Sequence, residues 1–214
     1  AAARATVSAS ANTRTTGPAA AFRREPPPPA DLPGAEPAPG GPRASDVKWP
    51  TPTLPRVAVS FRGSAYSDTE EDQAALDLIA FLAFSPASEL YQKLYIEEQK
   101  VDSLSADNPD RVDPNLFTIM ARVKKESDLE QVQQQIPATC ERFREKPVEA
   151  DRLEAVKKHL RYGFALQMNN SEAIASTLAR YIALRRTPET LNRLYELYAK
   201  ATPADIQRIA GKYF

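Results

Sequence analysis

The spacing of hydrophobic residues changes within one stretch, residues 85–106, around which the predicted fold is arranged. Ser88 precedes an apolar stripe at helical spacing and can accept a hydrogen bond from a free N–H group of the first turn. The stripe consists of Leu90, Tyr91, Leu94 and Tyr95. The period then becomes two, with Val101, Ser103 and Ser105 alternating with Asp102, Leu104 and Ala106. The stretch predicts an amphipathic helix that leads directly into a β-strand.

Two further strands are predicted by alternating positions. Residues 54–62 place Val57, Val59 and Phe61 on one side. Residues 116–123 place Phe117, Ile119, Ala121 and Val123 on one face. The second and third strands are separated by the turn signal Asn108-Pro109-Asp110, which predicts an antiparallel sheet.

The other segments have helical periodicity. Helices are predicted over 68–84, 128–144, 148–168 and 171–184, followed by two helices that start at Thr187-Pro188 and Thr202-Pro203. Ser67 with Glu70, and Ser127 with Glu130, have the spacing of capping boxes. Pro137 is expected to kink its helix or remove one hydrogen bond. For the helix over 148–168 the predicted buried side is Leu153, Val156, Leu160, Phe164 and Leu166.

This order of strands and helices predicts an α+β fold in which helices cover an antiparallel sheet. Residues 1–46 differ from the rest, because they hold 9 of the 19 prolines and 4 of the 7 glycines but no Ile, Met, Trp or Tyr. Such a composition cannot bury enough apolar surface to offset its chain entropy. We therefore predict a disordered Pro/Ala-rich tail or linker over 1–46 and one α+β domain over 47–214.

Composition excludes several classes of function. Lys and Arg total 28, as do Asp and Glu, so no global charge favours nucleic acid. No apolar run near 18 residues is apparent, so no membrane span is predicted, and the N-terminus has no continuous apolar segment of the secretory kind. The only cysteine is Cys140 and the only histidine is His159, which excludes an internal disulfide and any metal site that needs two histidines.

These two residues are the candidates for independent catalysis. His159 has no acidic residue four positions away on either side, so the simpler interpretation is a partly exposed structural histidine. Arg142 and Arg144 follow Cys140, and cationic neighbours can lower the pKa of a thiol, but a buried packing residue is the preferred interpretation. The residues alone predict a domain without a self-sufficient active site.

From about residue 49 to the end, the chain resembles the second half-domain of the insulinase/pitrilysin-type zinc peptidases, the family that includes mitochondrial processing peptidase. The segments that carry the resemblance occur in the family's order. They are LPRVAVSFRGSAYSDTEEDQAALDLIAFLAF, SELYQKLYIEEQKVDSLSA, DPNLFTIMARV, KPVEADRLEAVKKHLRYGFAL, NSEAIASTLARYIAL and ATPADIQRIAGKYF. The resemblance implies the α+β half-domain fold of that family.

The resemblance also implies what this chain lacks. In the family, zinc is held by an H-x-x-E-H motif on the first half-domain, whose glutamate acts as general base. A chain with one histidine cannot contain that motif. We therefore expect no cofactor in this chain, zinc on a separate catalytic half-domain or partner subunit, a peptide substrate for the pair, and no peptidase activity of the chain alone. Many bacterial members are exported to the periplasm or cell envelope, but the sequence leaves the compartment open.

Some members use an arginine, and a tyrosine seven residues later, to hold the substrate backbone. Carried over by position, these places are Tyr95 and Asp102, neither of which matches. Tyrosine does not replace the cationic hydrogen-bonding fork of arginine, and a carboxylate would repel a developing oxyanion. Tyr91, Tyr95, Asp102 and Ser103 are retained as candidates for a wall of the substrate chamber.

Three functions remain open at this point. The first is a non-catalytic half-domain that packs on a zinc-bearing half and helps to enclose peptide substrate. The second is a catalytically inactive structural or protein-binding homologue of the family. The third is an independent enzyme that uses His159 or Cys140.

Overall fold

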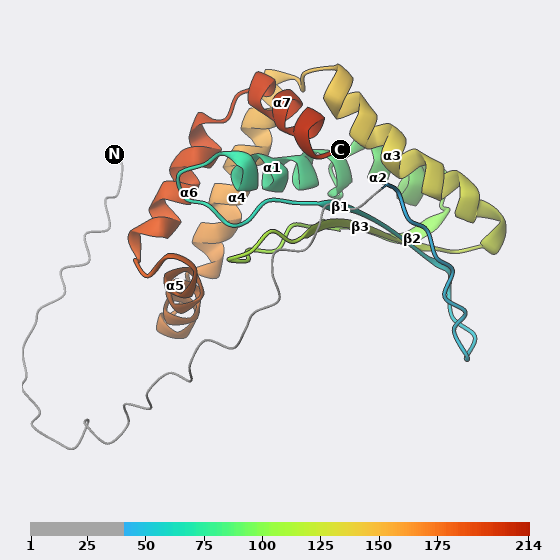
Figure 1. Cartoon of the computed structure of the whole chain (residues 1–214), viewed down its shortest axis with the longest axis horizontal. Helices are drawn as coiled ribbons and strands as arrows, with labels where there is room; N and C mark the ends of the chain where they lie inside the picture. Colours follow the sequence, from blue (N-terminus) through green and yellow to red (C-terminus); the bar gives the residue numbers. More distant parts are fainter. Residues whose placement is uncertain (1–40) are drawn as a thin grey trace, which may run out of the picture. The chain divides into compact units, whose positions relative to one another are not determined.

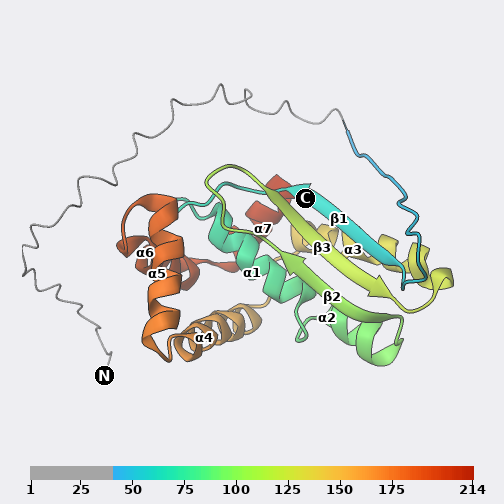
Figure 2. The same ribbon diagram turned by 90° about the horizontal axis from the view of Figure 1, so that it is seen from below.

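A computed structural model describes residues 41–214, in which helices cover one face of a three-stranded antiparallel sheet (Figures 1 and 2). The strands are β1 (Arg56–Arg62), β2 (Val101–Asp107) and β3 (Leu116–Val123), in the order β1-β3-β2. The predicted α+β class and the antiparallel sheet are confirmed. Residues 1–40, most of the tail predicted from composition, lie outside the described residues. Trp49–Phe214 forms the compact unit to which the following description applies.

The helical elements follow the predicted order, with adjusted bounds. They are α1 (Asp72–Phe84), α2 (Glu89–Tyr91), the π-helix η2 (Gln92–Glu97), the 3-10 turn η3 (Glu126–Asp128), α3 (Leu129–Glu145), α4 (Ala150–Gln167), α5 (Ser171–Arg185), α6 (Glu189–Lys200) and α7 (Pro203–Tyr213). Helices α1, α3 and α7 lie over the sheet, whereas α4, α5 and α6 gather beyond one end of it (Figure 2).

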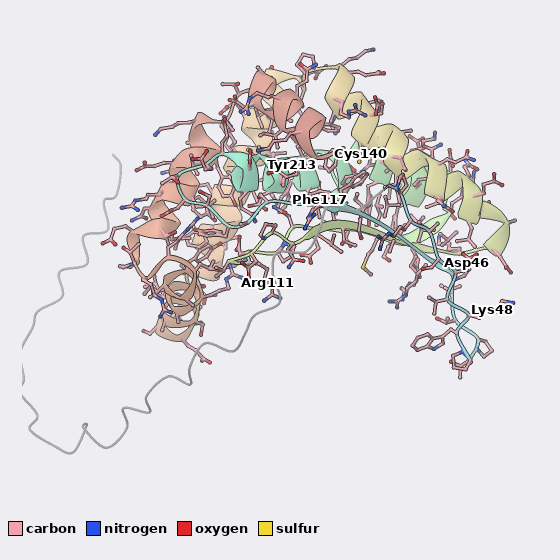
Figure 3. The ribbon with its side chains drawn as sticks, in the orientation of Figure 1. Asp46, Lys48, Arg111, Phe117, Cys140 and Tyr213 are labelled. Carbon is pink, nitrogen blue, oxygen red and sulfur yellow. The ribbon has the colours of Figure 1, made fainter. Side chains whose placement is uncertain are left out.

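The main core lies between the sheet and these helices. The predicted inner face of β3 is confirmed, since Phe117, Ile119, Ala121 and Val123 are all buried. Across from it α1 contributes Leu78, Ile79 and Leu82, each at most 1% exposed. Phe117 and Cys140 lie on opposite sides of this layer (Figure 3). A smaller cluster around Tyr66, Tyr181, Leu191 and Leu194 joins α5 and α6 to the rest of the domain.

Two predicted helix starts are wrong. Ser67 does accept hydrogen bonds from the N–H groups of Thr69 and Glu70, at 3.2 and 2.9 Å, but α1 begins only at Asp72. Asp68 forms ion pairs with Arg185 and Arg193 instead of joining the helix. Ser67 therefore closes a turn ahead of α1 rather than capping it. Ser127 does not cap α3, because it lies within the 3-10 turn η3 that precedes this helix. In this turn the Asp128 N–H donates to the Lys125 carbonyl.

The two Thr-Pro segments that begin α6 and α7 have similar sequences but differ in how they cap the helix. Thr202 and Asp205 form a complete capping box, with Pro203 in the first turn of α7. At α6 the N-cap residue is Pro188, which has no capping side chain, and the hydroxyl of Thr187 one position earlier accepts a long hydrogen bond of 3.4 Å from the Glu189 N–H. Pro137 lies within a continuous α3 and is exposed, so the hydrogen bond that it removes falls on the solvent side.

The predicted buried side of α4 is only partly correct. Leu153 is buried, and Val156, Leu160 and Phe164 are partly buried, but Leu166 is 56% exposed. The second half of α4 therefore exposes some of its apolar side chains to solvent.

One run of the chain passes a composition test for a membrane span. Asp72–Glu97, which comprises α1, α2 and η2, has a mean hydropathy of 1.3 in its most apolar window. This run was not singled out at the sequence level. Of that window 56% is buried within the domain, and a core helix of a non-membrane protein passes the same test.

Candidate functional site

The segment from Ser88 to the start of β2 positions the candidate wall residues. Ser88 is 1% exposed, and its hydroxyl accepts a hydrogen bond from the Tyr91 N–H at 3.2 Å, so the predicted cap is confirmed. After one α-helical turn the backbone widens, and the Glu98 N–H donates to the Lys93 carbonyl at 2.8 Å. Gln99 then takes a left-handed conformation, with φ 52°, and releases the chain into β2. The amphipathic helix predicted from the sequence is therefore mainly a π-helix, an arrangement that is often found at functional sites.

Two tyrosines form an aromatic pair on this segment. The rings of Tyr91 and Tyr95 stack with centroids 4.7 Å apart and an interplanar angle of 18°. Both are partly buried, and the Lys124 ammonium group lies 6.0 Å from the centre of the Tyr95 ring. The buried side chains Leu90 and Leu94 hold the segment against the core. The pair presents a flat apolar surface with a cation beside it.

Asp102 lies at an irregularity in the pairing of β2 with β3. Val101 pairs with Val123 and Ser103 pairs with Arg122, so Asp102 is an extra residue in β2. As a result Val101 and Leu104 are both buried, and the strict alternation predicted from the sequence is wrong. Register shifts of this kind depend on the neighbouring strand and are not visible in the hydrophobic pattern.

The bulge brings the Asp102 carboxylate to Arg122. Arg122 Nε donates to Asp102 Oδ1 at 2.6 Å, and this hydrogen bond holds the pKa of Asp102 below its usual range. Lys124 adds to the effect through its charge. Ser103 is exposed beside this pair. The carboxylate therefore faces solvent as part of an ion pair rather than as an isolated negative charge.

The structure thus joins the four candidates into two pairs. Tyr91 contacts Tyr95, and Asp102 is adjacent to Ser103 on β2. Among the described residues no hydrogen bond or ring contact links the tyrosines to Asp102 or Ser103; Lys124 approaches both pairs. Arg122 and Lys124 were missed at the sequence level. The only signal for Arg122 was its position on the face of β3 opposite the buried residues.

A partly buried polar network that joins α1, α6 and the loop after β2 was also missed. Asp77 on α1 accepts hydrogen bonds from the Tyr198 hydroxyl at 2.6 Å and from Asn108 Nδ2 at 2.8 Å. Gln73 donates to Asp110 Oδ1 at 3.1 Å, so the network ties α1 and α6 to the loop that follows β2. Desolvation raises the pKa of Asp77 to about 7, and the nearby carboxylates of Asp110 and Asp107 contribute to the shift. The network fixes the loop between β2 and β3.

The two candidates for independent catalysis have no catalytic setting. His159 is exposed, and its ring centre lies 6.1 Å from that of Phe81. Cys140 is buried, and burial raises the pKa of its thiol to about 12. The preferred interpretation of Cys140 as a buried packing residue is confirmed, and Arg142 and Arg144 pair with Glu89 and Glu141. Neither residue supports the independent-enzyme hypothesis.

The residues also do not fit the zinc of the resembled family. Within residues 41–214, no group of three or more His, Cys, Asp or Glu side chains is placed to hold a metal ion. Because stable zinc sites use three or four such ligands, we expect the purified chain to retain no zinc. After incubation with equimolar zinc and dialysis into zinc-free buffer, elemental analysis should give a zinc content far below one per chain. A stoichiometric content of one zinc would contradict this prediction.

Comparison with known proteins identifies a family. The family model described as "Peptidase M16 inactive domain" matches residues 11–160, that is 150 of the 214 residues. A search of curated proteins finds no match. Several solved structures have the same fold, although their low sequence identity carries the comparison no further than the fold.

Three of these structures illustrate the match. A protease from Helicobacter pylori superposes with a TM-score of 0.67 and 21% identity, over 74% of this chain and 38% of that protease. A second structure is the inactive peptidase domain of a Bordetella parapertussis protein assigned as a zinc protease. It superposes with a TM-score of 0.63 and 22% identity, over 76% of this chain and 88% of that domain. A Bordetella pertussis protein assigned as a zinc protease superposes with a TM-score of 0.60 and 23% identity, over 73% of this chain and 86% of that protein. The chain therefore spans well under half of the Helicobacter protease.

Proposed function

The chain belongs to the peptidase M16 inactive-domain family, the C-terminal domain of insulinase/pitrilysin-type zinc proteases, and from this premise we propose that it packs on a zinc-bearing half and helps to enclose the peptide substrate. In this role it supplies surface and no chemistry. The observation that carries the proposal is the uncovered apolar surface on α4 and α5.

That surface consists of side chains that a folded domain normally covers. Tyr162 and Leu166, one turn apart on α4, are 66% and 56% exposed, and Ile174 and Ile182 on α5 are 41% and 36% exposed. Large apolar side chains exposed on two successive helices are the kind of surface that interfaces use. The fold provides no further element to cover it in the described residues. Since this chain spans only 38% of the Helicobacter protease, we assign the surface to the zinc-bearing half.

The candidate wall is a different surface. It is formed by the Tyr91–Tyr95 pair and by the Asp102–Arg122 ion pair, with Ser103 beside it. Stacked aromatic rings offer contact area without a sequence requirement, and the ion pair carries no net charge to repel a peptide. This mixture suits a passive wall that accepts varied peptides.

Binding to the zinc-bearing half tests the proposal. The partner is the H-x-x-E-H-bearing half-domain or subunit encoded in the same genome, and complex formation is measured by analytical ultracentrifugation. We expect a 1:1 complex with the wild-type chain, and loss of the complex in the double variant Leu166→Glu/Ile174→Glu. Val112→Glu is the matched control, because Val112 is 66% exposed but lies in the loop between β2 and β3.

The result decides between the remaining functions. Absence of a complex, or equal binding by the double variant, would contradict the assigned docking surface. A complex that hydrolyses no peptide would favour the alternative, a catalytically inactive structural or protein-binding homologue of the family.

A further inference from the structure

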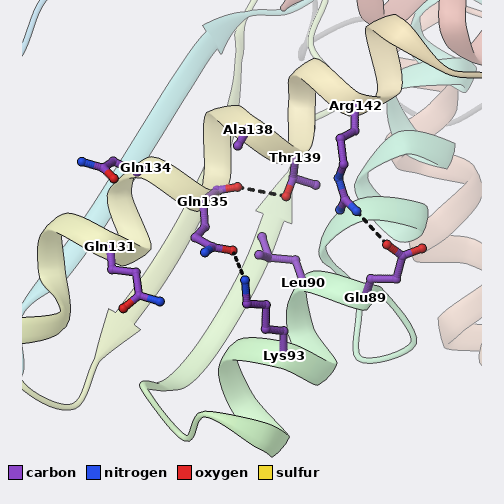
Figure 4. Close-up of a pocket in the computed structure, with 9 residues that line it drawn as sticks. All are labelled: Glu89, Leu90, Lys93, Gln131, Gln134, Gln135, Ala138, Thr139 and Arg142. Atoms are coloured by element: carbon purple, nitrogen blue, oxygen red, sulfur yellow. Dashed lines mark hydrogen bonds and ion pairs between the residues drawn. The ribbon is translucent and has the colours of Figure 1, made fainter.

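A groove runs between the α2–η2 segment and α3, apart from the surfaces described above (Figure 4). Its volume is about 570 Å³. The residues that line it are Glu89, Leu90, Lys93, Gln131, Gln134, Gln135, Ala138, Thr139 and Arg142. A second hollow of about 210 Å³ shares Glu89, Leu90, Thr139 and Arg142 with it and extends to Arg152 at the start of α4. Because the two hollows share these lining residues, they lie next to each other on the surface.

The length of the groove matches a short extended peptide. The lining residues of α3 recur at helical spacing from Gln131 to Arg142, so they form a single face of that helix. Eleven residues at a rise of about 1.5 Å each give a length of roughly 16 Å. An extended peptide advances about 3.3 Å per residue, so about five residues occupy this length.

The sides of the groove offer hydrogen-bonding groups suited to a peptide backbone. Gln135 Oε1 accepts a hydrogen bond from Lys93 Nζ at 3.1 Å, whereas its Nε2 group has no partner within residues 41–214. Gln134 Nε2 donates to Glu130 Oε1 at 3.3 Å, and the side-chain oxygen Oε1 of Gln134 has no partner within residues 41–214. Each residue of an extended peptide brings one N–H donor and one C=O acceptor. The buried side chain of Leu90 provides an apolar floor beneath these amides.

One end of the groove carries excess positive charge. Arg142 and Arg152 both bind the single carboxylate of Glu89, at 2.8 and 2.6 Å. These two hydrogen bonds, with the two positive charges, lower the pKa of Glu89, so it is ionised at neutral pH. No second carboxylate of the described residues pairs with either guanidinium. Two guanidinium groups beside one carboxylate leave one positive charge uncompensated, which a carboxylate from another molecule would neutralise. Arginine binds carboxylates with paired N–H donors.

We propose that this groove binds an extended peptide segment of about five residues that carries a carboxylate, with the carboxylate placed at Arg142 and the backbone along Gln134 and Gln135. The site lies on the η2–α3 side of the domain and uses neither the α4–α5 surface nor the Tyr91–Tyr95 pair. It therefore stands independently of the proposed assembly with a zinc-bearing half.

Fluorescence anisotropy with the full chain tests the site. The probes are the fluorescein-labelled, amidated peptides GTVDVT and GTVNVT, which differ only in one carboxylate. We expect saturable binding of both, with the acidic peptide bound about tenfold more tightly, which is the smaller end of the range for a hydrogen bond to a charged group. Arg142→Gln should remove this preference. Arg144→Gln, which alters an arginine on the same helix that pairs with Glu141 outside the groove, should retain it.

A blocking variant separates the groove from the rest of the surface. Ala138→Trp places an indole in the groove at an exposed position and should abolish binding of both peptides. Gln133→Trp places the same side chain on an exposed position of α3 that does not line the groove, and binding should persist. Circular dichroism of both variants verifies the fold. No saturable binding by the wild-type chain, or unchanged binding by Ala138→Trp, would overturn the proposal.

Discussion

The Asp77→Asn variant is expected to be more stable than the wild-type chain at pH 8, and its advantage should shrink as the pH falls. In the folded chain the pKa of Asp77 is raised from 3.8 to about 7 by desolvation, and Asp110 and Asp107 add to the shift. The folded state therefore binds a proton more tightly than the unfolded state does. Stability from this group is fully present below pH 3.8 and is lost as the pH rises through 7.

The size of the effect follows from the shift. One pKa unit corresponds to about 1.36 kcal/mol, so the ionised carboxylate costs at most about 4 kcal/mol of unfolding free energy at pH 8. Asparagine removes the charge and keeps one oxygen to accept the hydrogen bond from the Tyr198 hydroxyl, but it loses the hydrogen bond from Asn108 Nδ2, so the gain at pH 8 is smaller than this limit. The Tyr198 hydroxyl is neutral throughout this pH range, because burial and Asp77 raise its pKa well above the usual value.

Urea denaturation at pH 5, 6.5 and 8 provides the measurement. The control is Asp113→Asn, which removes an exposed carboxylate from the loop between β2 and β3. The difference between Asp77→Asn and wild type should grow with pH, whereas the control should follow the wild type. A difference that does not vary with pH would show that Asp77 is not held in a desolvated site, because the loss of the Asn108 hydrogen bond is the same at every pH.

The Leu94→Ala variant should lose about 2–5 kcal/mol of unfolding free energy, the range for truncating a buried leucine. Leu94 is 0% exposed and is the buried residue of η2, so it anchors the segment that carries Tyr91 and Tyr95 to the core. Its removal leaves a cavity directly beneath the candidate wall.

Ile96→Ala in the same π-helix is the matched control. Ile96 is 52% exposed, so its truncation removes few contacts and should change stability by less than about 0.5 kcal/mol. Thermal and urea unfolding of the two variants give the comparison. Equal effects of the two substitutions would mean that η2 is not anchored through Leu94.

Local sequence signals predicted those parts of the fold that depend on neighbouring residues in the chain. The alternation of β3 gave four buried residues on one face, and Ser88 and Thr202 gave two helix caps. Each of these needs only a periodic pattern or a hydroxyl at the right distance from a helix start.

The features missed from the sequence all depend on contacts between distant segments. The bulge at Asp102 and its pairing with Arg122 require the register between β2 and β3. The network around Asp77 requires α6 and the loop after β2 to meet α1. The false caps at Ser67 and Ser127 have the correct local spacing, and tertiary contacts or a tighter turn displace the helix start. The four candidate wall residues could therefore be proposed from the sequence, whereas the pairing of Asp102 with Arg122 could not be predicted from it.

The most direct test of the non-catalytic role is a hydrolysis assay with an internally quenched, unstructured peptide in the presence of zinc. The rate is measured for this chain alone, for the H-x-x-E-H-bearing half or subunit alone, and for the two mixed at equal concentration. We predict no hydrolysis above background by this chain, and a faster rate for the mixture than for the zinc-bearing partner alone. Hydrolysis by this chain alone, or a mixture no faster than the partner, would contradict the account.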